Sequence, residues 1–273
     1  MGRTAHSTGG MASISNSLSH SVSATVALVR SLPPWLLCLF AAGAGHAEGL
    51  GSTLSVGGNL AVTSDYIYRG VSQSDGHGAL QAELHATSGG GNFIGAWAST
   101  RDNSFDPYAN ADVELYLGHH FDLGGVWGAA LSGRAHYFVG GNQQVSDDYQ
   151  EIIASLTYMD RWALSLTAIP NAVRYWYTQR LSRSPAWVAE TSGQWLIGEW
   201  FFVTGGAGYY RATGTGPGIE AANGFAYGNA GLAFEYRRWR LDVSYFLTQE
   251  KAQQLFPYPT ADHRVAGTLL WRF

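Results

Sequence analysis

Cysteine, lysine and charge are all scarce in this chain. Cys38 is the only cysteine and Lys251 the only lysine among 273 residues, and charged residues make up 13%. An ordinary soluble domain carries roughly a quarter. A formal net charge of −4 without a basic stripe gives no indication of a nucleic-acid partner. Long apolar runs are also missing, because the stretch that begins at Leu32 is shorter than the about 20 residues of a membrane-spanning helix.

Aromatic residues and glycine are abundant instead. Phe, Trp and Tyr reach 14% of the chain, glycine occurs 35 times, and the mean hydropathy is nearly neutral at −0.08. A helical membrane protein would need long apolar segments. This composition favours a surface that alternates between lipid and water, as in an outer-membrane β-barrel.

The first 47 residues are predicted to be a cleaved signal peptide. Residues 1–30 are polar and rich in serine, an apolar stretch follows, and Gly45 and Ala47 place small residues before a cleavage site at Glu48. An uncleaved signal anchor is the alternative. Because Cys38 lies inside this segment, the mature chain, residues 48–273, has no thiol for a disulfide or a thiolate metal site. Residues 48–273 are expected to form one barrel domain.

Period-two alternation of apolar and polar residues organises the mature chain. It is clear from Leu80 to Ala86, from Trp239 to Leu247 and from Val265 to Phe273. Counting such runs predicts twelve strands, most of them near the about 9–11 residues of a tilted membrane strand. The runs lie near residues 53–68, 79–88, 92–100, 111–121, 126–139, 149–159, 162–169, 186–192, 199–211, 226–237, 239–250 and 263–273. The eighth run has the weakest pattern, and a ten-strand barrel with residues 186–200 rearranged is the alternative.

The connections between the runs sort by length. Long ones follow the odd-numbered runs, at 69–78, 101–110, 140–148, 170–185, 212–225 and 251–262. Most of those after the even-numbered runs are tight turns, and the one at 193–198 is intermediate. Long extracellular loops that alternate with short periplasmic turns are typical of membrane barrels. The sequence therefore predicts an all-β fold, an antiparallel up-and-down transmembrane β-barrel of about 12 strands in a bacterial outer membrane.

Aromatic residues near the ends of the runs fit the interfacial girdles of such a barrel. They are Tyr66, Tyr68, Trp127, Tyr137, Trp162, Tyr209, Trp239 and Trp271. Core aromatics of a soluble sheet are the alternative interpretation. The chain ends on an alternating strand, and we assign Trp271 and Phe273 as an assembly signal for the barrel-assembly machinery, because this end resembles the outer-membrane insertion signal.

The N-terminal strands resemble the TorF-like porin family of proteobacterial outer-membrane proteins. The resemblance rests on VTSDYIYRGVSQS at 62–74, GALQA at 78–82, GAWAS at 95–99 and ELYLG at 114–118. It covers residues 60–120, and the sequence departs from the family pattern at 99–101. The resemblance implies an outer-membrane barrel with a porin function.

Strand phase assigns twelve ionisable side chains to the interior of the barrel as pore-lining candidates. They are Asp65, Arg69, Glu83, His85, Glu114, Arg134, His136, Glu151, Glu235, Arg240, Asp242 and Arg264. Buried unpaired charges cost several kcal/mol each, so these groups must pair or face water. A hydrated pore and a dry lumen closed by ion pairs both satisfy this requirement.

The segment around Tyr66 and Tyr68 allows two interpretations. In one, Arg69 lies at the pore mouth, where its guanidinium attracts anions or pairs with Asp65. In the other, the segment is a structural turn in which Gly70 supplies a positive φ and the tyrosines mark the interface. We favour the turn.

No catalytic, cofactor-binding or metal site is predicted. Asp75 and His77 offer only two possible metal ligands. A lipid-face hydrolase would need an outward serine and histidine with an orienting acid. By strand phase His85 and His136 face inward, and the outward faces carry almost no polar residues. The glycine-rich segments lack the helix that a nucleotide-binding loop precedes.

The sequence thus predicts a porin, a narrow passive channel for small hydrophilic solutes. It would contact outer-membrane lipid and lipopolysaccharide, and loops 140–148 and 170–185 would gate its entrance. A closed structural or adhesion barrel that binds a partner through its extracellular loops is one alternative. An outer-membrane lipid-modifying enzyme is the other.

Overall fold

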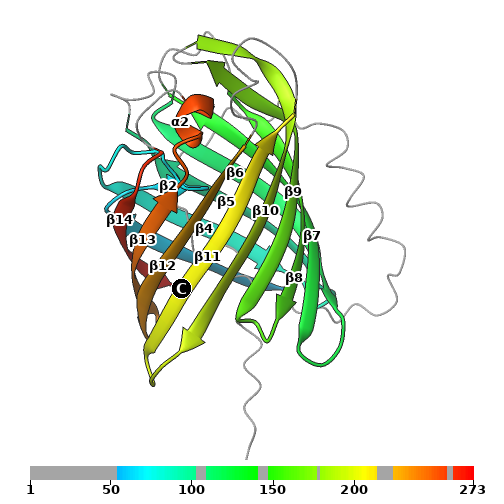
Figure 1. The fold of residues 1–273 in the computed structure, drawn as a ribbon. Helices are drawn as coiled ribbons and strands as arrows, with labels where there is room; N and C mark the ends of the chain where they lie inside the picture. Colours follow the sequence, from blue (N-terminus) through cyan, green and yellow to red (C-terminus); the bar gives the residue numbers. More distant parts are fainter. Residues whose placement is uncertain (1–53, 103–108, 141–146, 177–178, 214–223, 257–260) are drawn as a thin grey trace, which may run out of the picture.

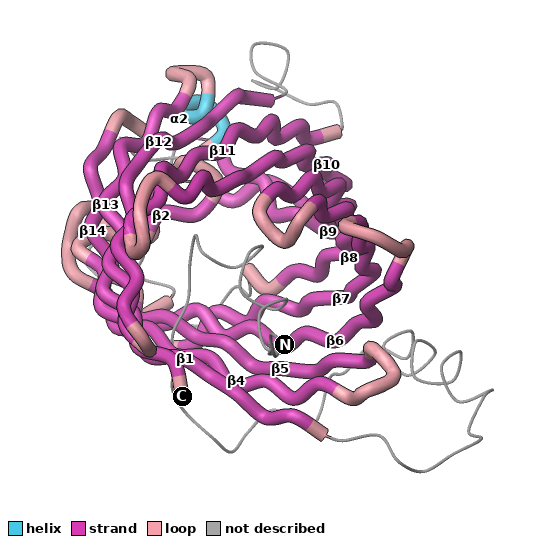
Figure 2. The backbone as a smooth tube through the Cα atoms, turned by 90° about the horizontal axis from the view of Figure 1, so that it is seen from below, coloured by secondary structure: helices cyan, strands magenta, loops and turns pink. Residues whose placement is uncertain are grey.

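Twelve antiparallel strands close into one barrel, with each strand paired to its neighbours in sequence and β1 paired to β14 (Figures 1 and 2). The computed structural model describes residues 54–102, 109–140, 147–176, 179–213, 224–256 and 261–273. The predicted signal peptide lies outside the described residues. Among the described residues, no helix is long and apolar enough to cross a membrane.

The barrel strands confirm the predicted twelve, and with them the all-β fold. They are β1 (Ser55–Thr63), β4 (Ala79–Thr87), β5 (Asn92–Thr100), β6 (Ala111–Asp122), β7 (Trp127–Val139), β8 (Tyr149–Tyr158), β9 (Trp162–Trp176), β10 (Gln179–Leu196), β11 (Phe201–Ala212), β12 (Gly224–Tyr236), β13 (Trp239–Thr248) and β14 (Arg264–Arg272). The remaining elements are the short strands β2 (Ile67–Tyr68) and β3 (Val71–Ser72) and the helix α2 (Ala252–Leu255). We call one end of the barrel the turn end. It holds the connections β4–β5, β6–β7, β8–β9, β10–β11 and β12–β13. The opposite end is the loop end.

Two predicted boundaries are wrong. The expected loop at 170–185 is mostly strand, because β9 and β10 continue as a paired hairpin to Trp176 and Gln179. Irregularities beside Pro185 shift the register there, which hides the strand from a strict period of two. The first run ends at Thr63 instead of continuing to residue 68, and the chain then turns into the barrel.

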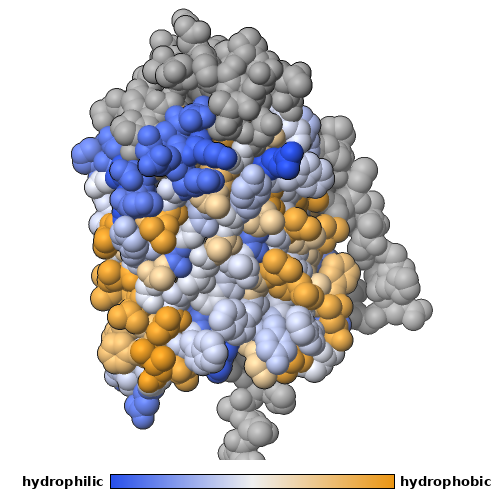
Figure 3. Space-filling view, viewed as in Figure 1, coloured by the Kyte–Doolittle hydropathy of each residue, from blue (hydrophilic) through white to orange (hydrophobic). Residues whose placement is uncertain are grey.

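Large apolar side chains cover the outside of the barrel. On β13, Trp239, Leu241, Val243, Tyr245 and Leu247 are 43% to 50% exposed, whereas the alternate residues point inward. On the face drawn in Figure 3, hydrophobic residues gather over the middle and lower wall and hydrophilic residues gather at the loop end. Apolar exposure on this scale marks a surface that contacts lipid or another apolar partner.

Aromatic pairs line the outside of the turn end. The pairs, with ring centroids 4.7 to 6.4 Å apart, are Trp127–Tyr158, Trp162–Trp195, Trp200–Tyr236, Phe201–Phe234 and Trp239–Trp271. This is the position of an interfacial girdle. Tyr66, Tyr68 and Tyr137 were expected in the girdles, but Tyr66 and Tyr137 are buried and Tyr68 lies inside the barrel.

The last strand closes the barrel. β14 pairs with β1 from Thr63↔Thr268 to Asn59↔Arg272. Beyond that register, Phe273 and Gly58 exchange two backbone hydrogen bonds of 3.1 and 3.3 Å. The C-terminal residue is therefore part of the seam, and its role as an assembly signal stays a prediction.

Candidate functional site

A short hairpin folds into the lumen at the loop end. Residues Ile67–Ser72, which we call the inner hairpin, pair as β2 and β3 with Ile67↔Ser72 and Tyr68↔Val71 in register. Arg69 and Gly70 form its two-residue turn with φ of 49° and 76°. Positive φ at both central residues is typical of a type I′ turn, which explains the glycine at the second position. The predicted turn is confirmed, but it lies inside the barrel.

The tip of the inner hairpin rests on β12 and β13. The Thr248 hydroxyl donates a hydrogen bond of 2.6 Å to the Gly70 carbonyl. A Cβ atom at Gly70 would lie 2.6 Å from Cβ of Tyr227 and 2.5 Å from the Thr248 hydroxyl oxygen, which is too close for any larger residue. The tip is thus fitted tightly against this part of the wall.

The Arg69 side chain reaches the wall on the other side. Its guanidinium binds the Glu151 carboxylate of β8 through two contacts of 2.6 and 3.2 Å. The Tyr68 hydroxyl donates to the same carboxylate at 3.2 Å. In the ring of twelve strands, β8 and β13 are separated by five steps. The inner hairpin therefore crosses the lumen.

The base of the inner hairpin is organised by Asp65. Its carboxylate accepts hydrogen bonds from the hydroxyls of Ser72 and Ser74 at 2.5 and 3.0 Å, and it pairs with Arg264 at 3.3 Å. Asp65 therefore pairs with Arg264 of β14 and not with Arg69, contrary to one of the sequence interpretations. The base of the hairpin is tied to the barrel seam.

Acidic side chains of β6 and β8 gather beside the hairpin around His136. The His136 ring lies 3.4 to 3.7 Å from carboxylate oxygens of Asp112, Glu114 and Glu151, and Arg134 pairs with Glu114 at 3.0 Å. His136 and the three carboxylates are buried, and the Arg134 side chain is 15% exposed. Because buried carboxylates are stable only when paired, this cluster holds its charge through neighbouring cations.

Tyr66 connects this cluster to the chain that leads into the hairpin. Its hydroxyl donates to Asp112 at 3.0 Å, and its ring meets Trp97 edge to face at 5.8 Å. Burial, and the Asp112 carboxylate beside it, raise the pKa of Tyr66 well above its usual value. The phenol therefore stays protonated and remains a hydrogen-bond donor.

Asp112, Glu114 and His136 are also the described residues best placed to hold a metal ion. Their potential ligand atoms lie within 4.8 Å of one another. Arg134, however, already supplies a positive charge to Glu114. A guanidinium at this distance repels a second cation, so the chemistry of the cluster favours an ion-pair network.

An apolar cluster fills the loop end around the hairpin. Val71 packs there with Ile169, Val188, Tyr210 and Phe225, which point inward from β9, β10, β11 and β12. Ala252 of helix α2 belongs to the same cluster. This part of the lumen is packed like a protein core, so the loop end is narrowed by both polar and apolar contacts.

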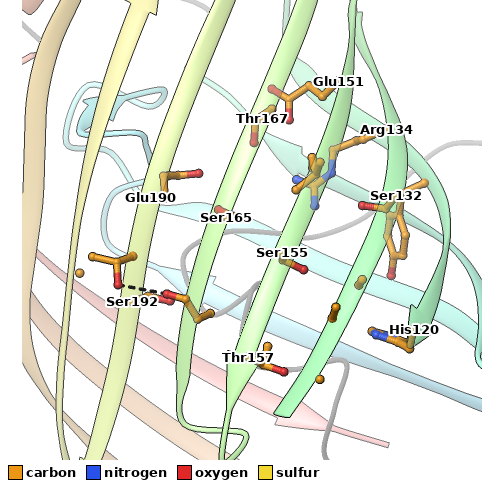
Figure 4. A pocket seen from close by; sticks show the side chains of 18 of the residues that line it. His120, Ser132, Arg134, Glu151, Ser155, Thr157, Ser165, Thr167, Glu190 and Ser192 are labelled. Carbon is orange, nitrogen blue, oxygen red and sulfur yellow. Dashed lines mark hydrogen bonds between the residues drawn. The ribbon is translucent and has the colours of Figure 1, made fainter. Parts of the chain in front are cut away.

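Below the inner hairpin the lumen widens into a cavity of about 870 Å³. Tyr68, Arg69 and Gly70 line its upper side, and the turn residues 89–91 and Asp160 line its lower side. Figure 4 shows side chains from β6 to β10 that surround it, with Arg134 and Glu151 near the top and Thr157 near the bottom. The cavity therefore extends from the hairpin to the turn end.

The other predicted interior residues form two further groups on the inner face. Glu83 accepts hydrogen bonds from Asn59, at 2.6 Å, and from Tyr116, and His85 lies 3.9 Å from it. At the turn end, Arg240 binds Asp242 at 2.8 and 2.9 Å and Glu235 at 3.1 Å. The twelve candidates thus lie in paired networks on the inner side, and their role in lining a pore stays a prediction.

Several side chains that shape the site were missed in the sequence. Thr248 and Tyr227 hold the hairpin tip, and Glu190 accepts a hydrogen bond of 2.7 Å from Tyr227. Period-two phase would have placed these residues inward, but nothing in their own pattern points to a hairpin more than 100 residues earlier in the chain. The two loops predicted to gate the entrance, 140–148 and 170–185, are not confirmed as gates. Residues 141–146 lie outside the described residues, and 170–185 is largely strand.

The described histidines contact carboxylates, amides and aromatic rings. His77 pairs with Asp102, His119 lies 2.9 Å from Asn92, and His120 packs on Phe93 with centroids 4.5 Å apart. These contacts hold the three imidazole rings in place. The expectation that the protein has no enzymatic activity stays a prediction.

A family model described as a bacterial protein of unknown function (Gcw_chp) matches residues 47–175. The match spans β1 to β8, the inner hairpin and most of β9. It relates this part of the chain to a bacterial family but gives no function, and the TorF-like name stays a prediction. No curated protein matches the chain.

Three solved outer-membrane proteins illustrate the similarity in fold. The NanC porin is 11% identical with a TM-score of 0.48, and the match covers 80% of this chain and 98% of that one. The KdgM porin is 6% identical with a TM-score of 0.45 over 81% and 98%. The COG4313 channel of Pseudomonas putida F1 is 12% identical with a TM-score of 0.42 over 85% and 98%. At this level of similarity they say nothing about the solute.

Proposed function

We propose that this chain is an outer-membrane porin, a passive channel for small hydrophilic solutes, and that the inner hairpin constricts it. The observation that carries this proposal is the contrast between an outside covered by large apolar side chains and a cavity lined by charged and hydroxyl side chains. An outward apolar band with girdle aromatics fits a bilayer, and an inward polar face fits water. The short turns then face the periplasm and the long loops face the exterior.

The inner hairpin lies across this path at the loop end. Its polar ties to the barrel wall include the Arg69–Glu151 ion pair and the Thr248 hydrogen bond to Gly70. The strands of the hairpin pair with each other and not with the barrel strands, so the hairpin can move without unpairing the barrel. Solutes would collect in the cavity from the periplasmic side and pass the hairpin when it shifts.

The packing around Val71 favours a second candidate, a closed barrel that binds an external partner. Val71 belongs to an apolar cluster in the lumen with Val188, Phe225 and Ala252, and such packing resists hydration. In that case the barrel is a scaffold and the cavity is a blind pocket. The two candidates differ in one measurable property, conductance.

Single-channel conductance in a planar bilayer separates them. We would compare the wild-type barrel with a variant in which residues 66–76 are replaced by a short Gly-Ser linker. A porin constricted by the hairpin gives small steps in the wild type and larger steps in the variant. Heat-modifiable gel mobility verifies that both barrels have folded. If neither folded barrel conducts, the closed barrel is correct.

Arg134→Ala supplies a control for the hairpin effect. Arg134 lines the cavity and pairs with Glu114, but it makes no hydrogen bond with the hairpin that the described structure shows. Its loss should shift ion selectivity towards cations without the larger steps of the linker variant. An unchanged selectivity would mean that ions do not pass Arg134.

A further inference from the structure

Three aromatic rings lie flat on the cavity wall because each faces a glycine. Phe93 is in register with Gly118, Tyr116 with Gly95, and Tyr227 with Gly208. A Cβ atom at each of these glycines would lie 2.3 to 2.5 Å from the facing ring. The rings therefore occupy the space above the glycines, as in aromatic rescue of glycine in designed sheets. All three rings line the cavity.

Hydrogen bonds fix the two tyrosine rings in this position. Tyr116 donates its hydroxyl proton to Glu83, and Tyr227 donates to Glu190 at 2.7 Å. Phe93 is held by His120, whose ring centroid is 4.5 Å away. Since the hydroxyl groups of both tyrosines already have acceptors, what these residues offer to the cavity is the face of the ring.

Hydroxyl groups line the adjoining part of the wall, between the strands that carry Tyr116 and Tyr227. They project from four neighbouring strands, β7 to β10 (Figure 4), and belong to Ser132, Ser155, Thr157, Ser165, Thr167 and Ser192. Ser155 and Ser165 stand directly opposite each other in register. Each hydroxyl can donate one hydrogen bond and accept two. This wall therefore offers many neutral donors and acceptors within a small area.

The charged side chains in the upper part of the cavity balance one another. Here two arginines, Arg69 and Arg134, are matched by two glutamates, Glu151 and Glu190, whereas Asp122 and Asp160 lie at the turn end. Arg69 is paired with Glu151, and Glu190 is 3.9 Å from the same guanidinium. In this upper part neither an anion nor a cation finds an excess of opposite charge, so the electrostatic field there does not favour a charged solute over a neutral one.

We propose that the cavity binds a neutral polyhydroxylated solute, a sugar or a sugar alcohol. The C–H face of the sugar packs on the ring of Phe93, where the negative face of the ring attracts the polarised C–H groups. Its hydroxyls exchange hydrogen bonds with the serines and threonines of the adjoining wall. The cavity volume of about 870 Å³ is that of a small-molecule site. This inference rests on the proposed porin function and names the solute class.

The test compares three pyranoses of one size and different charge: glucose, glucuronate and glucosamine. Saturation-transfer NMR on the detergent-solubilised full barrel detects binding without requiring transport. Swelling of proteoliposomes then gives relative permeation rates for the same three compounds. Glucose should give saturation transfer to its C–H protons and permeate about threefold faster than either charged sugar.

Two variants locate the binding surface. Phe93→Leu keeps an apolar side chain but removes the ring, and Thr157→Val keeps the shape but removes the hydroxyl. Each should weaken glucose binding by about threefold. The matched controls are Phe201→Leu, at a lipid-facing ring on β11, and Thr213→Val, whose hydroxyl bonds Pro185 outside the cavity. Both controls should bind glucose as the wild type does.

The outcomes separate this inference from the porin proposal. A barrel that conducts ions but binds the three sugars equally, or binds glucose unchanged after Phe93→Leu, overturns the sugar inference and leaves the porin function intact. A barrel that binds glucose but never conducts, even without its hairpin, overturns the porin function and leaves the site as a blind sugar pocket.

Discussion

Arg69 and Glu151 lie 82 positions apart in the chain and meet inside the barrel as a two-point ion pair of 2.6 and 3.2 Å. The Glu151 side chain is fully buried and the Arg69 side chain is 9% exposed. A buried carboxylate that loses its partner is strongly destabilised, whereas the net value of an intact pair is smaller. The ion pair therefore links the inner hairpin to the buried Glu151 carboxylate of β8 in the barrel wall.

A double-mutant cycle should reveal this coupling. Arg69→Gln alone leaves Glu151 without its guanidinium, and Glu151→Gln alone leaves Arg69 without its carboxylate, so each should destabilise the folded barrel. The double variant should cost less than the sum of the two, by about 1–3 kcal/mol. Guanidinium unfolding in lipid vesicles measures all four proteins, and Arg69→Gln should also conduct in larger steps.

Arg211→Gln serves as the control for this cycle. Arg211 is exposed at the loop end of β11. Its loss should change neither stability, by more than about 0.5 kcal/mol, nor conductance. Strict additivity of Arg69→Gln and Glu151→Gln would show that the pair does not hold the hairpin.

Alkaline pH should weaken the barrel through Tyr66. Burial raises the pKa of this phenol in the folded protein well above its usual value of 10, while the unfolded chain keeps the usual value. Below pH 10 both states are protonated and stability does not depend on this group. Above it only the unfolded chain ionises, so stability falls as pH rises.

Tyr66→Phe should reduce this loss. At about pH 11 the variant should lose about 1 kcal/mol less than the wild type, relative to about pH 8. Chemical unfolding at the two pH values gives the difference. Tyr209→Phe, at an exposed tyrosine, controls for the substitution itself. The same loss in Tyr66→Phe as in the wild type would mean that the phenol is open to solvent.

The barrel seam should not tolerate a methyl group at Gly58. A Cβ atom there would lie 2.3 Å from the Glu83 carbonyl oxygen and 2.7 Å from the Phe273 ring. The carbonyl belongs to the paired strand β4 and cannot move away, so Gly58→Ala should cost about 1–3 kcal/mol. Gly90→Ala, where the nearest atom is 3.9 Å away, should cost less than about 0.5 kcal/mol. Unfolding midpoints and heat-modifiable mobility measure both, and equal midpoints would mean that the seam is loose.

The fold could be predicted from sequence because one face of every strand contacts a different solvent from the other. Alternation such as that from Trp239 to Leu247 is a direct record of this difference. This alternation is lost where β9 and β10 extend beyond the length of a membrane-spanning strand. The extension of β9 and β10 carries Pro170 and Pro185 and a shifted register, so its sequence predicts a loop.

The site could be predicted only in part. Phase alone placed Glu151, Glu114 and Arg134 inward, but it could not pair them, because their partners come from other strands. The segment from Tyr66 to Gly70 carries aromatic residues at alternate positions, as a membrane strand does, and nothing local shows that Asp65 turns it inward. One of the partners of Asp65, Arg264, lies 199 residues away in the sequence.

If the outer wall faces lipid, an arginine should affect stability differently at two adjacent residues of β9. Leu166 points outward and is 58% exposed, whereas Ser165 points into the cavity. An arginine on the lipid face near the middle of the bilayer costs about 2–4 kcal/mol, so Leu166→Arg should be destabilised by that amount in lipid vesicles. Ser165→Arg places the same charge in the polar cavity and should be close to the wild type. If both variants are equally stable, the outside of the barrel does not face hydrocarbon, and the apolar band must be covered by protein instead.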